Sequence, residues 1–129
     1  MPTDTAKRFN VLLVDDSRLM RTLLKRAVEL SQIPLGSVFE ASNGREALAV
    51  LEAHTVDALF TDINMPEMTG FELLSTINQQ ARWKTMVRVV ISANDSAAER
   101  TRSEELGASQ YVDKPFTPDA VRVALSRLL

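Results

Sequence analysis

Acidic side chains follow two apolar segments of the chain. Asp15 and Asp16 come directly after the run Val11–Val14, and Asp62 comes two residues after the run Ala58–Phe60. If these segments are neighbouring strands of a parallel sheet, the carboxylates meet at the edge where the strands end. Like charges so close together are costly unless a cation neutralises them. Oxygen ligands without His or Cys predict a hard divalent ion, Mg²⁺ or Mn²⁺.

A hydroxyl group and an ammonium group follow two further segments. Ser92 closes the run Val87–Ile91, and Lys114 comes just after the segment Ser109–Val112. A metal ion, a hydroxyl and an ammonium around one acid are what a transferring phosphoryl group requires, because they neutralise its equatorial oxygens and fix the line of attack. Each residue alone is explained by a cap, a turn or a solvated side chain. Their coincidence at successive strand ends favours phosphoryl chemistry.

The elements that must position these residues alternate in type along the chain. Short apolar runs rich in β-branched residues suit strands that are buried on both faces of a parallel sheet. Such strands are predicted at Val11–Val14, Val38–Ala41, Ala58–Phe60, Val87–Ile91 and Ser109–Val112. Helical spacing of apolar residues predicts helices at Ser17–Leu30, Gly44–Ala53, Phe71–Ile77, Ser96–Leu106 and Pro118–Leu128, the last with Thr117 as its N-cap.

This alternation predicts a doubly wound α/β fold of the flavodoxin-like type. Strands that alternate with helices form a parallel sheet covered on both faces and joined by right-handed crossovers. We expect one domain over residues 1–129, with five strands in the order 2-1-3-4-5 and five helices. The helix Ser96–Leu106 is expected to be loosely held, because its charged residues leave only Ala97, Ala98 and Leu106 to pack.

Composition excludes other kinds of site. The chain has no Cys and one His, His54, which excludes disulfides, thiolate catalysis and His-rich metal clusters. A net charge of −2 gives no general attraction to nucleic acid. No apolar run approaches the ~20 residues needed to cross a bilayer. The N-terminus Met1–Thr5 lacks the apolar core of a signal peptide. We therefore expect a cytoplasmic protein.

Several stretches resemble the receiver domains of two-component response regulators, especially those of the single-domain chemotaxis type (CheY-like). The similar stretches are VLLVDDS at 11–17, ASNGREAL at 41–48, DINMPEMTG at 62–70, VISA at 90–93 and GASQYVDKPF at 107–116. The resemblance implies that Asp62 is the phosphorylated aspartate and that Asp15 and Asp16 are the acidic pair that holds Mg²⁺. Asp62 itself and the backbone carbonyl of Asn64 would complete the metal ligands.

Other matched residues concern phosphoryl binding and switching. The resemblance implies that the hydroxyl of Ser92 and the charge of Lys114 contact the phosphoryl group, and that Ser92 and Tyr111 form the switch. Position 92 is more often threonine in the family, but serine keeps the hydroxyl. The peptide bond before Pro115 is cis in the family, which would aim the lysine into the site. Asn94 is a further polar neighbour of the site.

The predicted function is that of a stand-alone signalling receiver rather than a conventional enzyme. A histidine kinase or phosphotransfer protein would donate the phosphoryl group to Asp62, and the chain would catalyse only its own phosphorylation and dephosphorylation. The helix Ser96–Leu106, the strand Ser109–Val112 and the last helix would form the surface that binds a protein target. We expect a monomer that binds neither nucleic acid nor membrane.

Three other functions fit the sequence less well. A pseudo-receiver would bind partners without phosphorylation, and the complete set of acids, serine and lysine argues against it. A Mg²⁺-dependent phosphatase with an aspartyl nucleophile typically has a second acid two residues later, where this chain has Asn64. A nucleotide-binding domain of the same architecture would carry a G-x-G-x-x-G or Walker-type loop, which the sequence lacks.

Overall fold

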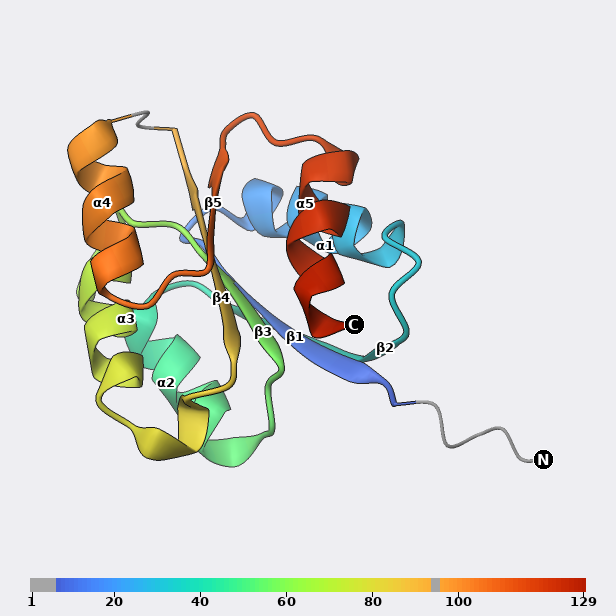
Figure 1. Cartoon of the computed structure of the whole chain (residues 1–129), viewed down its shortest axis with the longest axis horizontal. Coiled ribbons are helices and arrows are strands. Elements are labelled where there is room, and N and C mark those ends of the chain that lie inside the picture. The colour runs from blue at the N-terminus through green and yellow to red at the C-terminus, as the bar shows by residue number, and fades with distance from the viewer. Residues whose placement is uncertain (1–6, 94–95) are drawn as a thin grey trace.

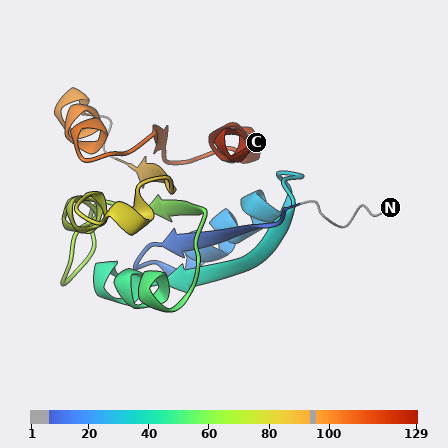
Figure 2. The same cartoon turned by 60° about the horizontal axis from the view of Figure 1, so that its bottom comes forward.

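Parallel strands form the centre of the structure, seen in a computed structural model that describes residues 7–93 and 96–129. Within these residues the strands are β1 Phe9–Val14, β2 Leu35–Ala41, β3 Ala58–Thr61, β4 Val87–Ser92 and β5 Gln110–Asp113. All neighbouring pairs are parallel, in the order β2-β1-β3-β4-β5. Figure 2 shows this order, from β2 in cyan at one edge to β5 in orange at the other. The predicted strand order is confirmed.

Helices cover both faces of the sheet. In the described part of the chain they are α1 Arg18–Glu29, α2 Gly44–Ala53, α3 Gly70–Asn78, α4 Ala97–Glu105 and α5 Pro118–Leu125, with short 3₁₀ helices η2 Ala81–Trp83 and η3 Ser126–Leu128. Figure 1 shows α1 and α5 on one side of the sheet and α2, α3 and α4 on the other. No helix among the described residues combines the length and apolar character that a membrane span needs.

Strand β1 shows why the central strands are continuously apolar. Successive side chains of a strand point to opposite faces of the sheet. Val11 and Leu13 pack in the cluster that includes residues of α1 and α5, whereas Leu12 and Val14 pack in the cluster that includes residues of α2 and α3. All four side chains are fully buried. Residues 11–14 are therefore apolar, whereas the polar Asn10 lies near the start of the strand, where it is only partly buried.

The helices begin close to the strand ends because polar caps define their first turns. The side chain of each N-cap residue accepts a hydrogen bond from a backbone N–H of the first turn. These residues are Ser17, Asn43, Thr69, Ser96 and Thr117. The prediction of Thr117 as the last N-cap is confirmed. Ser17 starts the helix after Asp15 and Asp16, and Thr69 starts the helix after Asp62. These caps therefore fix where the two loops end.

Helix α4 packs differently from the sequence-based expectation. Ala97 and Ala98, which were expected to pack, are exposed, whereas Glu99 and Ser103 are buried. The two buried residues are four positions apart and share one face of the helix. That face tolerates polar groups because the Ser103 hydroxyl donates to the carbonyl of Glu99 at 2.9 Å, while the Glu99 carboxylate accepts from a side chain of β4 at 3.0 Å. Leu106 is only partly buried.

Gly70 holds the loop after β3 against the start of α3. A Cβ atom at this position would lie 2.2 Å from the carbonyl oxygen of Asp62 and 2.8 Å from the Cα of Ile63. The Gly70 N–H also donates to the carbonyl of Ile63 at 2.8 Å. These neighbours are backbone atoms, which cannot move aside unless the whole loop shifts. Gly70 thus helps to fix the position of Asp62.

We expect Gly70→Ala to destabilise the fold by about 1–3 kcal/mol, the usual cost of forcing extra volume into a packed site. Chemical denaturation measures this change in the free energy of unfolding. Gly36→Ala is the matched control, because its new methyl group would meet a side-chain oxygen, that of Asn10, which can move at the expense of one hydrogen bond from the Ser37 N–H. A smaller loss in Gly70→Ala than in the control would contradict the role given to this glycine.

Candidate functional site

The aspartates gather at the carboxyl ends of β1 and β3. Asp15 and Asp16 follow β1, and Asp62 follows β3, its neighbour in the sheet. Backbone hydrogen bonds hold the two loops together, since the N–H of Asp62 donates to the carbonyl of Val14 at 3.0 Å. One carboxylate oxygen from each aspartate lies within 4.8 Å of the others. The sheet order thus brings together the acids that the sequence predicted to meet.

Lys114 reaches the aspartates from the end of β5. Its Nζ lies 3.0 Å from Oδ2 of Asp15 and 3.3 Å from Oδ2 of Asp62. The backbone N–H of Lys114 donates to the carbonyl of Ser92 at 2.9 Å, which ties the lysine to the end of β4. The peptide bond from Lys114 to Pro115 is cis. The sequence predicted this ammonium beside one acid, and the structure places it between two, with the shorter contact to Asp15.

The three acids differ in exposure and in their partners. Asp15 is 1% exposed and Asp62 is 8% exposed, whereas Asp16 is open to solvent. Both side-chain oxygens of Asp15 accept hydrogen bonds, Oδ1 from the N–H of Ser17 at 2.9 Å and Oδ2 from Lys114. Within residues 7–93 and 96–129, the carboxylate of Asp16 forms no such bond. Asp16 is therefore the acid that is most available to a ligand from solution.

The electrostatics of the site follow from burial and from the excess of acids. Burial raises the pKa of Asp62, the charge of Lys114 opposes this shift, and the neighbouring Asp15 adds to it. Burial acts to lower the pKa of Lys114, but its hydrogen bond to Asp15 and the charges of Asp62 and Asp15 outweigh burial and raise it. One ammonium thus contacts two of the three clustered carboxylates. The remaining negative charge suits a cation with oxygen ligands.

Ser92 lies at the end of β4, where the sequence placed it, but it has a partner that the sequence did not predict. The residue is 1% exposed, and its hydroxyl donates to Oε1 of Glu99 in α4 at 3.0 Å. Tyr111 lies on the neighbouring strand, in register with Val90. Burial raises the pKa of Tyr111, and hydrogen bonding with the Ser92 side chain opposes this shift. Ser92 therefore connects β4 to both α4 and β5.

Two predicted site residues remain without a demonstrated role. Asn64 is exposed in the loop that follows β3. Asn94 lies outside the described residues. Glu99, by contrast, was missed, because a glutamate in a highly charged helix reads as a solvated side chain. The only signal available in the sequence was its spacing of four from Ser103, which places both residues on one face.

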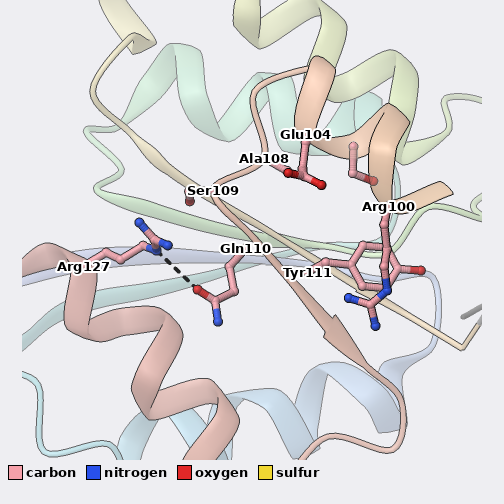
Figure 3. Close-up of a pocket in the computed structure, with 8 residues that line it drawn as sticks. Arg100, Glu104, Ala108, Ser109, Gln110, Tyr111 and Arg127 are labelled. Atoms are coloured by element: carbon pink, nitrogen blue, oxygen red, sulfur yellow. Dashed lines mark hydrogen bonds between the residues drawn. The ribbon is translucent and has the colours of Figure 1, made fainter. Parts of the chain in front are cut away.

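A pocket of about 320 Å³ lies on the side of the molecule formed by α4, β5 and the short helix η3 that follows α5 (Figure 3). Its lining residues are Arg100, Ser103, Glu104, Ala108, Ser109, Gln110, Tyr111 and Arg127. The guanidinium of Arg100 lies 4.4 Å from the centre of the Tyr111 ring, and Nε of Arg127 donates to Gln110 at 3.2 Å. This pocket lies on the surface that the sequence predicted for a protein target.

Removal of the Asp62 charge is expected to stabilise the fold at neutral pH. Because its pKa is raised on folding, the folded chain binds this proton more tightly than the unfolded chain does. The resulting loss of stability is absent below the unfolded pKa, near 3.8, and complete above the folded one. Without divalent ions, Asp62→Asn should melt at a higher temperature than the parent at about pH 7, and the difference should shrink as the solution is acidified.

Thermal melts at several pH values measure this difference. Glu105→Gln, which changes an exposed acid of α4, is the control for a general effect of charge. Two results would contradict the raised pKa of Asp62: a melting temperature of Asp62→Asn that equals the parent's at neutral pH, or a difference in melting temperature that grows on acidification.

Comparisons with known proteins agree with this geometry. The profile of the response regulator receiver domain matches residues 11–126. The chemotaxis protein CheY1 of Helicobacter pylori is 35% identical over 120 residues, which cover 92% of this chain and 95% of that protein. The two-component response regulator ORR3 of rice, Oryza sativa, is 35% identical over 121 residues, which cover 93% of this chain and 90% of that protein.

Solved structures give the same result. The chemotaxis response regulator CheY4 of Vibrio cholerae superposes with a TM-score of 0.84 at 30% identity, over 95% of this chain and 100% of that one. The sheet order, the acid-rich strand ends and these similarities lead to one conclusion. The chain belongs to the response regulator receiver family, whose members are signalling proteins that generally take a phosphoryl group on an aspartate.

Proposed function

We propose that the chain accepts a phosphoryl group on Asp62 from a histidine kinase or phosphotransfer protein and thereby controls the binding of a protein target. The observation that carries this proposal is the setting of Asp62. It is a nearly buried carboxylate that shares a cluster with Asp15 and Asp16 and lies 3.3 Å from the ammonium of Lys114. A carboxylate so placed is a nucleophile beside a fixed positive charge.

The transfer requires little chemistry from the protein beyond positioning. A carboxylate oxygen of Asp62 forms a bond to phosphorus as the bond from phosphorus to the donor's histidine nitrogen breaks. Lys114 already lies between Asp15 and Asp62, so its charge stands beside the incoming phosphoryl oxygens without a change in position. The chain catalyses only its own phosphorylation and dephosphorylation.

The acids fit Mg²⁺, or Mn²⁺, as the resident metal. The donor set consists of oxygens alone, and the cluster carries more negative charge than Lys114 neutralises. Asp15, Asp16, Asp62 and the backbone carbonyl of Asn64 would hold the ion. When bound, it supplies charge neutralisation to the phosphoryl oxygens. Because both oxygens of Asp15 already accept hydrogen bonds, we assign direct ligation to Asp16 and a contact through water to Asp15.

The output surface in this proposal is the face formed by α4, β5 and α5. A phosphoryl group adds about −1.5 to −2 charges at one point, which biases a two-state element without remodelling a packed core. Ser92 and Tyr111 lie between the phosphorylation site and this face, and the pocket of Figure 3 opens on it. Residues 1–129 act in this role as a cytoplasmic, monomeric receiver that binds neither nucleic acid nor membrane.

Phosphorylation tests the proposal directly. With acetyl phosphate and Mg²⁺, the parent chain should gain one phosphoryl group in an intact-mass spectrum, as an acid-stable, base-labile adduct. Asp62→Asn should gain none, because it keeps the shape of the side chain but lacks the nucleophile. Asp57→Asn is the control, since Asp57 precedes β3 and so lies at the amino-terminal end of the strand, away from Asp62.

Either of two results would contradict the assignment of Asp62 as the phosphoryl acceptor. A stoichiometric adduct that persists in Asp62→Asn would place the acceptor elsewhere. No adduct in the parent would favour a pseudo-receiver, which binds its partners without phosphorylation.

The metal site has its own test. Asp16→Asn should lower the affinity for Mg²⁺ by at least about tenfold, because it removes the carboxylate that is most available to the ion. Titration calorimetry measures this affinity. Glu67→Gln, which changes an exposed acid in the loop after β3, controls for the general loss of negative charge. Unchanged affinity in Asp16→Asn would show that the ion binds at another position.

A further inference from the structure

The hydrogen bond between Ser92 and Glu99 joins the end of β4 to the first turn of α4. Both residues are buried, at 1% and 8% exposure, and the bond from Oγ to Oε1 measures 3.0 Å. The other carboxylate oxygen of Glu99, Oε2, is buried and has no hydrogen-bond partner within the described chain. A buried carboxylate that is only half satisfied is costly, so this arrangement calls for an explanation in terms of function.

The chemistry of a hydroxyl makes this bond exclusive. Serine carries one O–H donor, so Ser92 cannot donate to Glu99 and to another acceptor at the same time. A phosphoryl group presents only acceptor oxygens to it. The role of Ser92 in phosphoryl binding, which belongs to the function proposed above, therefore requires that its bond to Glu99 breaks.

Glu99 is also close to the switch tyrosine and fixed to α4. Its N–H donates to the Ser96 hydroxyl at 3.2 Å and its carbonyl accepts from Ser103 at 2.9 Å, so its backbone belongs firmly to the first turns of the helix. The negative charge of Glu99 acts to raise the pKa of Tyr111, and hydrogen bonding with Ser92 acts to lower it. Glu99, Ser92 and Tyr111 thus form one interacting group.

A second position for the Glu99 side chain is available beside it. Glu99 and Arg102 both line a hollow of about 270 Å³ next to the loop that follows β3. The guanidinium of Arg102 lies over the ring of Phe71, 4.4 Å from its centre. Residues three apart on a helix can pair through their side chains, so a carboxylate that leaves Ser92 finds a cation on the next turn.

We propose that Glu99 is a positioning residue that holds the Ser92 hydroxyl in the resting state and is displaced when Asp62 is phosphorylated. This inference rests on the function proposed above. The phosphoryl group takes the only donor of Ser92, and its negative charge repels the carboxylate that has just lost its partner. Glu99 then turns toward Arg102, and the first turn of α4 moves with it. The phosphorylation signal enters the output face through this exchange.

Beryllofluoride, a phosphoryl mimic, tests the exchange in the whole chain. Tyr111 is the only tyrosine, so incorporation of 3-fluorotyrosine gives one ¹⁹F resonance that reports on this group. With Mg²⁺ present, the concentration of beryllofluoride that half-saturates the signal is measured for each variant. Glu99→Gln should need about tenfold less, because a neutral acceptor holds the hydroxyl less strongly than a carboxylate. Its resting signal should also lie nearer to the saturated position.

Arg102→Gln provides the opposite change at an exposed position. It removes the cation that receives the displaced carboxylate, so half-saturation should need about two- to threefold more beryllofluoride. Glu105→Gln, an exposed acid of the same helix, should titrate like the parent. Opposite shifts in the two variants are a result that general damage to the fold would not produce.

The outcomes separate this inference from the function on which it rests. If the parent responds to beryllofluoride but Glu99→Gln and Arg102→Gln titrate like it, or shift in the same direction, the role of Glu99 is refuted and the proposed function stands. If the parent itself shows no response to beryllofluoride, both the role of Glu99 and the proposed function are refuted.

Discussion

The ammonium of Lys114 lies between two nearly buried carboxylates, 3.0 Å from Asp15 and 3.3 Å from Asp62, and the arrangement of the site depends on this contact. Without a cation, acids from β1 and β3 would repel one another at the edge of the sheet. The lysine follows β5, which lies beyond β4 in the sheet, and its charge offsets part of this repulsion. The sheet order is therefore what allows the acids to be concentrated at one point.

The apolar strands impose this concentration. Because β1 and β3 are buried on both faces, their central residues are apolar and polar side chains gather at the strand ends. The cap Ser17 starts α1 directly after Asp16, whereas Thr69 starts α3 at the end of the longer loop 62–69. Gly70 adds a close backbone contact on the Asp62 side. One sequence pattern, apolar strands with polar residues at their ends, thus determines both the packing of the core and the placement of the charges.

The sequence predicted the sheet and the meeting of the aspartates because both follow from local patterns: continuous β-branched runs, and acids at the positions where they end. It did not predict the burial of Glu99 or the exposure of Ala97 and Ala98. The burial of these residues depends on how α4 packs over the end of β4. The helical periodicity of a highly charged segment cannot reveal such tertiary packing. The contact from Lys114 to Asp15 depends on side-chain orientation and was missed for a similar reason.

The difference between α4 and the other helices has a physical consequence. Helices α1 and α5 are held by apolar stripes, including Leu24 and Val28 in one and Val121 and Leu125 in the other. Such contacts weaken gradually as a helix shifts, and many of them must be lost together. The buried face of α4 carries instead Glu99 and Ser103, and the hydrogen bond from Ser92 to Glu99 joins this face to β4. A hydrogen bond is directional, and its donor can be taken by a stronger acceptor in a single step. A helix held in this way is suited to change between two positions, whereas the helices on the opposite face keep the sheet, and with it the aspartates, in place.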